Sequence, residues 1–222
     1  MTKDRVCEQI RSVGVIPAIR ANSAVNAVFA VEAVASGGIP IVEITMTVRD
    51  ALDVITELVG SGSGLIVGAG TVLDAEQAAQ CIAAGASFIT SPSLDEDVVR
   101  EAQRSNVAII PGAMTPTEVH AAEVMGCDFV KVFPCAQIGG PHYIRALRHP
   151  FPKIPLIASG GINQQTAAEY IRCGADVLGI GTGLVTPDAL DHHEAKRIRE
   201  LARRYLAIVR KTREELAENS AQ

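Results

Sequence analysis

The sequence predicts an α/β protein with the fold of a (β/α)8 TIM barrel and an extra helix at the N-terminal end. Eight short, nearly continuous apolar segments alternate with helical patterns along the 222 residues. Such strands are typical of a parallel sheet that is covered on both faces, and strict alternation with helices indicates parallel pairing. Eight units in this length favour one closed barrel domain over residues 1–222. A doubly wound open sheet is the alternative.

The eight strands are expected at regular spacing along the chain. Their ranges are 13–19, 39–45, 64–70, 86–92, 106–112, 127–134, 154–161 and 175–181. These segments are rich in β-branched residues and are bounded by glycine or by candidate helix caps. Pro17 and Pro40 fall within or at the start of strands, where each removes a backbone donor and weakens the predicted boundary.

Several of the expected helices begin at recognisable N-cap residues. Their ranges are 3–13, 23–36, 48–59, 74–85, a segment from 95, a segment after 115–116, 140–148, 163–174 and 192–216. Ser23, Asp74 and Asn163 are candidate N-caps, and Thr115 is followed by a proline at the first helical position. Glycines end several of these helices.

Composition excludes several classes of function. The net charge is −5 without a basic block, aromatic residues make up 4%, and Trp is absent, so we expect no nucleic-acid partner. Five cysteines without a CxxC pair, no signal peptide and no apolar segment of membrane length indicate a reduced, cytoplasmic protein with no membrane partner.

Two charged residues interrupt apolar strands. Lys131 alternates with Phe129 and Phe133, and Glu43 alternates with Ile41. Burial is costly for either charge unless the two are paired, and desolvation favours the neutral amine, which is the nucleophile that forms Schiff bases with carbonyls. The pair is therefore predicted to be catalytic. The alternatives are a structural buried ion pair and a lysine that reaches the end of its strand.

Glycine-rich turns follow the seventh and eighth strands, at 158–163 and 179–185. Loops at this point of a TIM barrel frequently bind phosphate through backbone N–H groups, although glycine also permits tight packing. Arg20 at the end of the first strand is either a clamp for an anion or a surface residue. Thr45 and Thr71 are candidate hydroxyl donors.

Metal and triad chemistry find little support in the sequence. None of the five histidines lies at the end of a predicted strand, and no Ser-His-Asp spacing or GxSxG motif occurs. We therefore expect no metal site.

A set of ordered motifs resembles the 2-keto-3-deoxy-6-phosphogluconate (KDPG) aldolase family, class I enzymes also described as 4-hydroxy-2-oxoglutarate aldolases. The motifs are VEIT with Glu43, GAGTV at 68–72, SP at 91–92, PGAMTPTE at 111–118, KVFP at 131–134 and SGGIN at 159–163. They stand in register with the predicted strands over residues 10–190.

The resemblance implies specific roles. Lys131 would form the Schiff base with the keto carbon, Glu43 would carry protons, and Phe133 would pack beside the imine. Thr71 and an arginine from the first or second strand would hold the carboxylate. The phosphate would bind at Gly160, Gly161, Gly181 and Thr182, and Thr45, Thr47, Pro92 and Ser159 are further substrate-binding candidates. No cofactor is implied, the substrate would be a 2-keto acid sugar phosphate, and members are commonly homotrimers.

This chain departs from the family pattern at two positions. Thr47 stands where one branch has arginine, with Arg20 as the expected replacement, and Ser159 stands where many members have threonine. The exact acid and the need for phosphate therefore stay open. Alternatives are 4-hydroxy-2-oxoglutarate as the main substrate, an isomerase or epimerase barrel, a non-catalytic phosphate-binding barrel and a metal-dependent aldolase.

Overall fold

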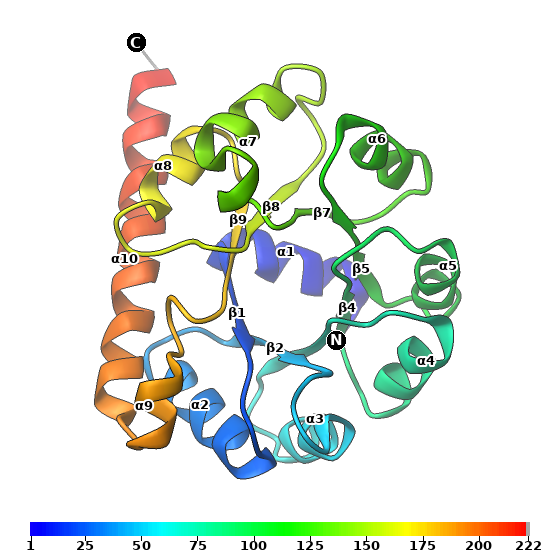
Figure 1. Cartoon of the computed structure of the whole chain (residues 1–222), viewed down its shortest axis with the longest axis vertical. Helices are drawn as coiled ribbons and strands as arrows, with labels where there is room; N and C mark the ends of the chain where they lie inside the picture. The colour runs from blue at the N-terminus through cyan, green and yellow to red at the C-terminus, as the bar shows by residue number, and fades with distance from the viewer. Residues whose placement is uncertain (221–222) are drawn as a thin grey trace.

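The computed structural model describes residues 1–220, which form a parallel barrel surrounded by helices (Figure 1). The nine strands of this part of the chain are ordered β5-β4-β3-β2-β1-β9-β8-β7-β6, with every neighbouring pair parallel. The strands are β1 (Val15–Ile19), β2 (Ile41–Thr45), β3 (Ile66–Gly70), β4 (Phe88–Thr90), β5 (Ala108–Ile110), β6 (Gly112–Ala113), β7 (Val130–Val132), β8 (Leu156–Ser159) and β9 (Val177–Ile180). The predicted fold class is confirmed.

The fifth predicted strand, residues 106–112, is divided, so its prediction as one continuous strand is wrong. β5 pairs with β4, whereas β6 pairs with β7. Pro111 lies between them and has no N–H to continue a ladder, although its carbonyl accepts a hydrogen bond from the Lys131 N–H at 2.9 Å. The division joins the two edges of the sheet. Gly112 makes it possible, because a Cβ there would lie 2.2 Å from the carbonyl carbon of Pro92.

The helices follow the predicted alternation. They are α1 (Lys3–Val13), α2 (Ala24–Ser36), α3 (Ala51–Gly60), α4 (Ala75–Ala83), α5 (Glu96–Arg104), α6 (Pro116–Val124), α7 (Gly140–Arg148), α8 (Ala167–Arg172), α9 (Pro187–Asp191) and α10 (Ala195–Ser220), with a 3₁₀ turn η1 (Ala136–Ile138). The N-caps at Ser23, Asp74 and Thr115 are confirmed, since each side chain accepts a hydrogen bond from the N–H three residues later. Each such cap is worth about 1 kcal/mol.

Two predicted helix starts are wrong for local reasons. Asn163 does not cap α8. Its side chain accepts hydrogen bonds from the N–H groups of Gln165 and Thr166, which holds a turn and delays the helix. The helix expected from residue 48 begins only at Ala51, because Asp50 before it has a φ of 58°, in the left-handed region.

The C-terminal region also differs from its prediction. The long helix expected over residues 192–216 is α10, which begins at Ala195 and extends to Ser220. The short helix α9 and the turn η1 were not predicted, because elements of five and three residues give no periodicity to detect. None of the helices described combines the length and hydropathy that a membrane span requires.

The hydrophobic residues form two clusters, one inside the barrel and one between the strands and the helices. The interior cluster includes Ile41, Ile66, Phe88 and Phe129. α1 crosses the centre of the barrel in Figure 1, and its buried residue Ile10 belongs to this interior cluster. α1 therefore plugs the amino-terminal end of the strands, and each fully buried isoleucine there contributes roughly 1.5–3 kcal/mol.

Candidate active site

Lys131 and Glu43 meet inside the barrel, although their strands are not neighbours. Lys131 is the middle residue of β7, and Glu43 is the middle residue of β2, with β1, β9 and β8 between them in the sheet. The distance from Lys131 Nζ to Glu43 Oε1 is 3.9 Å, and the side chains are 8% and 5% exposed. The predicted juxtaposition is therefore present. Because two ionisable groups this deeply buried are costly for a fold, they mark a functional-site candidate.

A small cavity of about 10 Å³ lies beside this pair. Its lining is Ile16, Glu43, Thr90, Ile110, Lys131, Ile157, Ser159 and Gly179. A volume of this size holds about one water molecule. The 3.9 Å gap between the lysine and the carboxylate is longer than a direct hydrogen bond, so a bridging molecule fits the geometry better than direct contact.

Glycines of the neighbouring strands make room for these side chains. A Cβ at Gly70 would lie 2.0 Å from Glu43 Oε1, so the carboxylate occupies the space above that glycine. A Cβ at Gly179 would lie 2.9 Å from the Oγ of Ser159. These two positions explain why the GAG and GIG segments carry glycine on the inner face of the barrel.

The Phe133 ring lies close to the amine. Lys131 Nζ is 5.3 Å from the ring centroid, within the range of a cation–π contact. Phe133 is half-buried and begins the loop after β7. The ring provides an apolar wall beside the position that an imine would occupy.

The loops after β7 and β8 are joined through their backbones. Cys135 N–H donates to the carbonyl of Ser159 at 2.8 Å, and Ala136 N–H donates to the carbonyl of Gly160 at 3.0 Å. Gly160 and Gly161 have φ values of 92° and 83°, which side chains rarely adopt. A Cβ on Gly161 would also lie 2.5 Å from the Ala136 Cβ. Close loop packing therefore accounts for both glycines, whether or not they also bind phosphate.

Thr71 occupies a strained position at the end of β3. Its φ is 61°, which is unusual for a β-branched residue, and its side chain is half-buried. Pro92 is half-buried after β4, Gly181 is half-buried after β9, and Thr182 is exposed beside it. These residues lie at the carboxyl ends of the strands, outside the lining of the small cavity.

Arg20 and Thr47 lie apart from the lysine cavity. They line a separate hollow of about 320 Å³ together with residues of the loop after β1 and of α9. Thr45 is fully buried, and its hydroxyl donates to the Ile19 carbonyl at 3.0 Å and lies 2.7 Å from the hydroxyl of Thr47. The structure thus brings Lys131, Glu43 and Ser159 into one cavity, while Arg20, Thr45 and Thr47 form a neighbouring group.

The sequence prediction missed Thr90, which lines the lysine cavity. The signal was available, because Thr90 stands two residues after Phe88 on a strand, and alternation places both on one face. Phe88 belongs to the barrel interior, so Thr90 points inward as well. A threonine in a strand was not distinguishable from a structural β-former by propensity alone.

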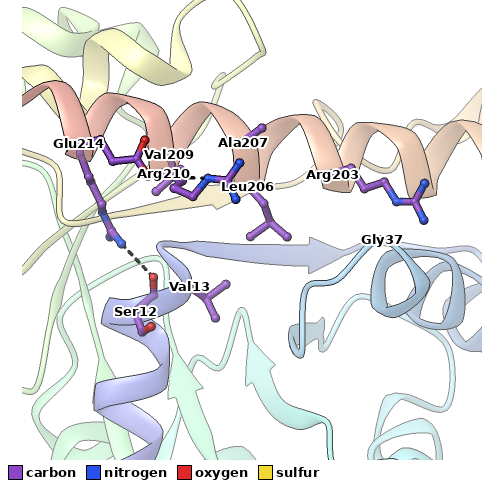
Figure 2. A pocket seen from close by; sticks show the side chains of 10 residues that line it. Ser12, Val13, Gly37, Arg203, Leu206, Ala207, Val209, Arg210 and Glu214 are labelled. Carbon is purple, nitrogen blue, oxygen red and sulfur yellow. Dashed lines mark hydrogen bonds and ion pairs between the residues drawn. The ribbon is translucent and has the colours of Figure 1, made fainter.

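A larger groove of about 450 Å³ lies at the other end of the barrel (Figure 2). Ser12 and Val13 line one side, and Leu206 and Arg210 of α10 line the other. Arg213 spans it by donating to the Ser12 carbonyl at 2.9 Å, and desolvation lowers the pKa of this guanidinium. The groove lies at the amino-terminal end of the strands and holds none of the predicted site residues, so we assign it a structural role.

Within residues 1–220, no group of three or more His, Cys, Asp or Glu side chains is arranged to hold a metal ion. The five cysteines are all free thiols.

The comparison with known families agrees with this geometry. A family profile described as "KDPG and KHG aldolase" matches residues 6–201. The chain belongs to the KDPG and KHG aldolase family. Membership places it among aldolases, which are carbon–carbon lyases, and confirms the resemblance seen in the motifs.

Individual relatives of the family cover nearly the whole chain. The 2-dehydro-3-deoxy-phosphogluconate aldolase of Dickeya dadantii (strain 3937) is 34% identical over 90% of this chain and 94% of its own length. The KHG/KDPG aldolase of Escherichia coli (strain K12) is 32% identical over 88% and 92%. The crystal structure of the KDPG aldolase from Legionella pneumophila with pyruvate captured as a covalent carbinolamine intermediate has a TM-score of 0.83 at 29% identity, over 89% of this chain and 96% of that one.

Proposed function

We propose that the protein is a class I aldolase that cleaves 2-keto-3-deoxy-6-phosphogluconate, or a close 2-keto-3-deoxy acid, to pyruvate and an aldehyde such as glyceraldehyde 3-phosphate. The observation that carries this proposal is the buried Lys131 amine, 3.9 Å from the Glu43 carboxylate inside the barrel. The names of the relatives from Dickeya dadantii and Escherichia coli support the substrate class.

The reaction begins when the Lys131 ammonium passes a proton to Glu43 and the neutral amine that results attacks the keto carbon of the substrate; Glu43 later returns this proton to the departing hydroxyl. The resulting carbinolamine loses water and becomes an iminium ion, which is an electron sink. The C3–C4 bond then breaks, its electron pair forms an enamine, and the aldehyde leaves. Protonation at C3 and hydrolysis release pyruvate and restore the Lys131 ammonium. The lysine itself supplies the electron sink, so this scheme has no step that uses a cofactor.

Glu43 is the proton carrier of the scheme. Its carboxylate lies on the opposite wall of the cavity from β7, within reach of Lys131 directly or through one water. It takes the proton of the C4 hydroxyl during cleavage and returns a proton to C3 of the enamine. The apolar lining of the cavity strengthens these charge interactions, because it excludes bulk water.

The substrate would extend from the cavity toward the carboxyl ends of the strands. We propose that Thr71 holds the carboxylate next to the keto carbon, that the Arg20 side chain reaches this carboxylate from the neighbouring hollow, and that Phe133 packs beside the imine. The distal phosphate would bind the backbone N–H groups around Gly160, Gly161 and Gly181, with the Thr182 hydroxyl as a further donor. Exposure of Thr182 and half-burial of Gly181 are consistent with a site at the rim.

An aldol cleavage assay tests the proposal. Pyruvate release is measured with 2-keto-3-deoxy-6-phosphogluconate, its unphosphorylated analogue and 4-hydroxy-2-oxoglutarate, using the wild type, Lys131→Ala and, as a control, Lys153→Ala on the exposed surface. We expect cleavage by the wild type and by Lys153→Ala only, with the phosphorylated acid preferred. Full activity of Lys131→Ala would overturn the mechanism. A preference for 4-hydroxy-2-oxoglutarate would mean that this acid is the main substrate.

We further propose that the chain acts as one domain in a homotrimer, an assembly inferred from the family resemblance. Sedimentation equilibrium of the wild type would show three times the 23.4 kDa chain mass. A monomer or a dimer at micromolar concentration would contradict it.

A further inference from the structure

The hydroxyl of Thr90 is buried without a hydrogen-bond partner. Thr90 ends β4 with 1% of its surface exposed, and its Oγ1 is one of two buried side-chain oxygens without a partner in residues 1–220. Leaving a hydroxyl unpaired in a protein interior is unfavourable, so such a group calls for an explanation. The other unpaired oxygen belongs to Ser91, which does not line the lysine cavity. Thr90 does line it.

The size and polarity of the cavity suit a single water molecule as the partner of this hydroxyl. Its volume of about 10 Å³ fits a single water-sized molecule, and its polar lining consists of Thr90, Ser159, Glu43 and Lys131. The remaining lining side chains, among them Ile110, are apolar. A water needs two to four polar partners. Because Thr90 has an unused hydroxyl on β4, a water here would be held between β4 and the Lys131–Glu43 pair.

We propose that Thr90 is a positioning residue that holds the water which hydrolyses the Schiff base on Lys131. This inference rests on the proposed aldolase function and adds a residue to it. The water oxygen bonds to C2 of the pyruvyl iminium, and the electron pair of the C=N bond moves to nitrogen. Glu43 takes one proton from that water. The Thr90 hydroxyl fixes the oxygen in line with C2.

The carbinolamine then breaks down to pyruvate and the lysine. Glu43 returns its proton to the carbinolamine nitrogen, the C–N bond breaks as the C2 carbonyl forms, and the nitrogen keeps the bonding pair. The hydroxyl proton of the carbinolamine passes through the carboxylate to the amine. Both protons of the water end on the Lys131 ammonium, its oxygen becomes the pyruvate carbonyl oxygen, and Glu43 is again a carboxylate. The reverse sequence dehydrates the carbinolamine when substrate binds.

Isotope exchange into pyruvate separates this step from the others. Each release of pyruvate by hydrolysis of the imine exchanges its carbonyl oxygen with H₂¹⁸O, whereas the released pyruvate carries deuterium at C3 only if the iminium has formed the enamine before that hydrolysis. Both exchanges are followed by mass spectrometry, and the uncatalysed exchange measured without enzyme is subtracted. The ratio of deuterium incorporated to oxygen exchanged therefore measures how the iminium divides between enamine formation and hydrolysis.

For Thr90→Val we expect the rate of oxygen exchange to fall about tenfold and this ratio to rise, because the hydrogen bond that holds the water is lost. We expect Thr90→Ser to keep the wild-type ratio, since it keeps the hydroxyl. The matched control is Thr212→Val, the same change at a residue of α10 that is 2% exposed and outside the cavity. It should leave the ratio unchanged. Thr90→Val should also melt close to the wild type, because the change keeps the shape of the side chain and removes no hydrogen bond to another protein group.

The outcomes separate this inference from the proposed function. If the wild type exchanges both isotopes and Thr90→Val gives the same ratio, Thr90 has no part in hydrolysis, while the aldolase proposal stands. If the wild type exchanges neither isotope above the uncatalysed rate, the aldolase proposal itself fails. Should Thr90→Val not fold, Thr90→Ala takes its place, and a wild-type ratio for that variant would overturn the inference equally.

Discussion

The two halves of the barrel interior are built from the same strands and differ in chemistry. On four strands, an apolar residue at the amino-terminal level is followed two positions later by a polar one. The pairs are Ile41 and Glu43, Phe88 and Thr90, Phe129 and Lys131, and Ile157 and Ser159. The apolar residues form the lower level of the interior, which packs against α1 and buries hydrophobic surface. The polar residues form the upper level, toward the carboxyl ends of the strands, and surround one cavity.

The polar upper level of the interior therefore depends for its stability on the apolar lower level. Buried charges and unpaired hydroxyls are unfavourable for folding, and apolar contacts of the lower level and α1 offset that cost. Variants of the upper level should therefore change catalysis, and variants of the lower level should change stability. Four predictions test this separation, in order of decreasing expected effect.

Glu43→Gln should have the largest effect and should act on catalysis. The amide keeps the shape of the carboxylate but cannot carry protons, so kcat should fall by about 10²–10⁴, as is typical for a lost general acid–base. Steady-state pyruvate release measures it. Glu57→Gln, on the exposed face of α3, is the control and should match the wild type. A kcat within twofold of the wild type would remove Glu43 from the mechanism.

Ile10→Ala should act on stability alone. Ile10 is fully buried in the plug helix, and its truncation should lower the free energy of unfolding by about 2–5 kcal/mol. Urea denaturation gives this value, and kcat per folded molecule should stay at the wild-type level. Arg5→Ala, exposed on the same helix, should change neither quantity. A large fall in kcat for folded Ile10→Ala would mean that the two levels are coupled.

Gly70→Ala should affect both properties, because the added methyl would crowd the buried carboxylate of Glu43. Its Cβ would lie 2.0 Å from Glu43 Oε1, so the carboxylate must move away from the amine. We expect a loss of about 1–3 kcal/mol in stability together with a lower kcat. In Gly60→Ala the added methyl meets no atom within 4 Å, so this control should be neutral. Unchanged activity in Gly70→Ala would show that the position of the carboxylate is not critical.

Alkaline pH should produce the smallest effect. Desolvation by burial raises the pKa of the Cys81 thiol from 9.0 to about 11 and, for the same main reason, that of Cys135 to about 12. Because the folded pKa exceeds the unfolded one, this stabilisation is complete below pH 9 and is lost as the pH rises toward the folded value. Each thiol should lower the unfolding free energy by about 1 kcal/mol at pH 10. Urea midpoints at pH 8 and pH 10 measure the loss, which should be smaller in Cys81→Ala; an equal loss would contradict the assignment.

The sequence predicted the barrel because burial on both faces makes the strands continuously apolar, and that pattern does not depend on long-range detail. It also predicted the meeting of Lys131 and Glu43, since alternation on each strand fixes which side chains point inward. The division at Pro111 was missed because closure depends on which neighbour each half of a segment pairs with. Which strand each half pairs with depends on contacts across the whole barrel and not on local propensity.

The finer features of the site were less predictable. Alternation is enough to place Thr90 on the inner face of the barrel, but its unpaired hydroxyl becomes informative only when its partners are known to be absent, and that requires coordinates. The placement of Arg20 and Thr47 in a separate hollow depends on α9, a helix too short to predict. The roles of the residues that the resemblance implied stay predictions, to be decided by the variants above.

Borohydride reduction in the presence of pyruvate, followed by peptide mapping, directly tests whether the buried amine of Lys131 is the nucleophile. We expect one modified lysine per chain, located at Lys131 in the wild type and absent in Lys131→Ala, with Lys153→Ala labelled as fully as the wild type. Equal labelling of Lys131→Ala, or an adduct on a surface lysine, would contradict the claim that the buried amine is the nucleophile.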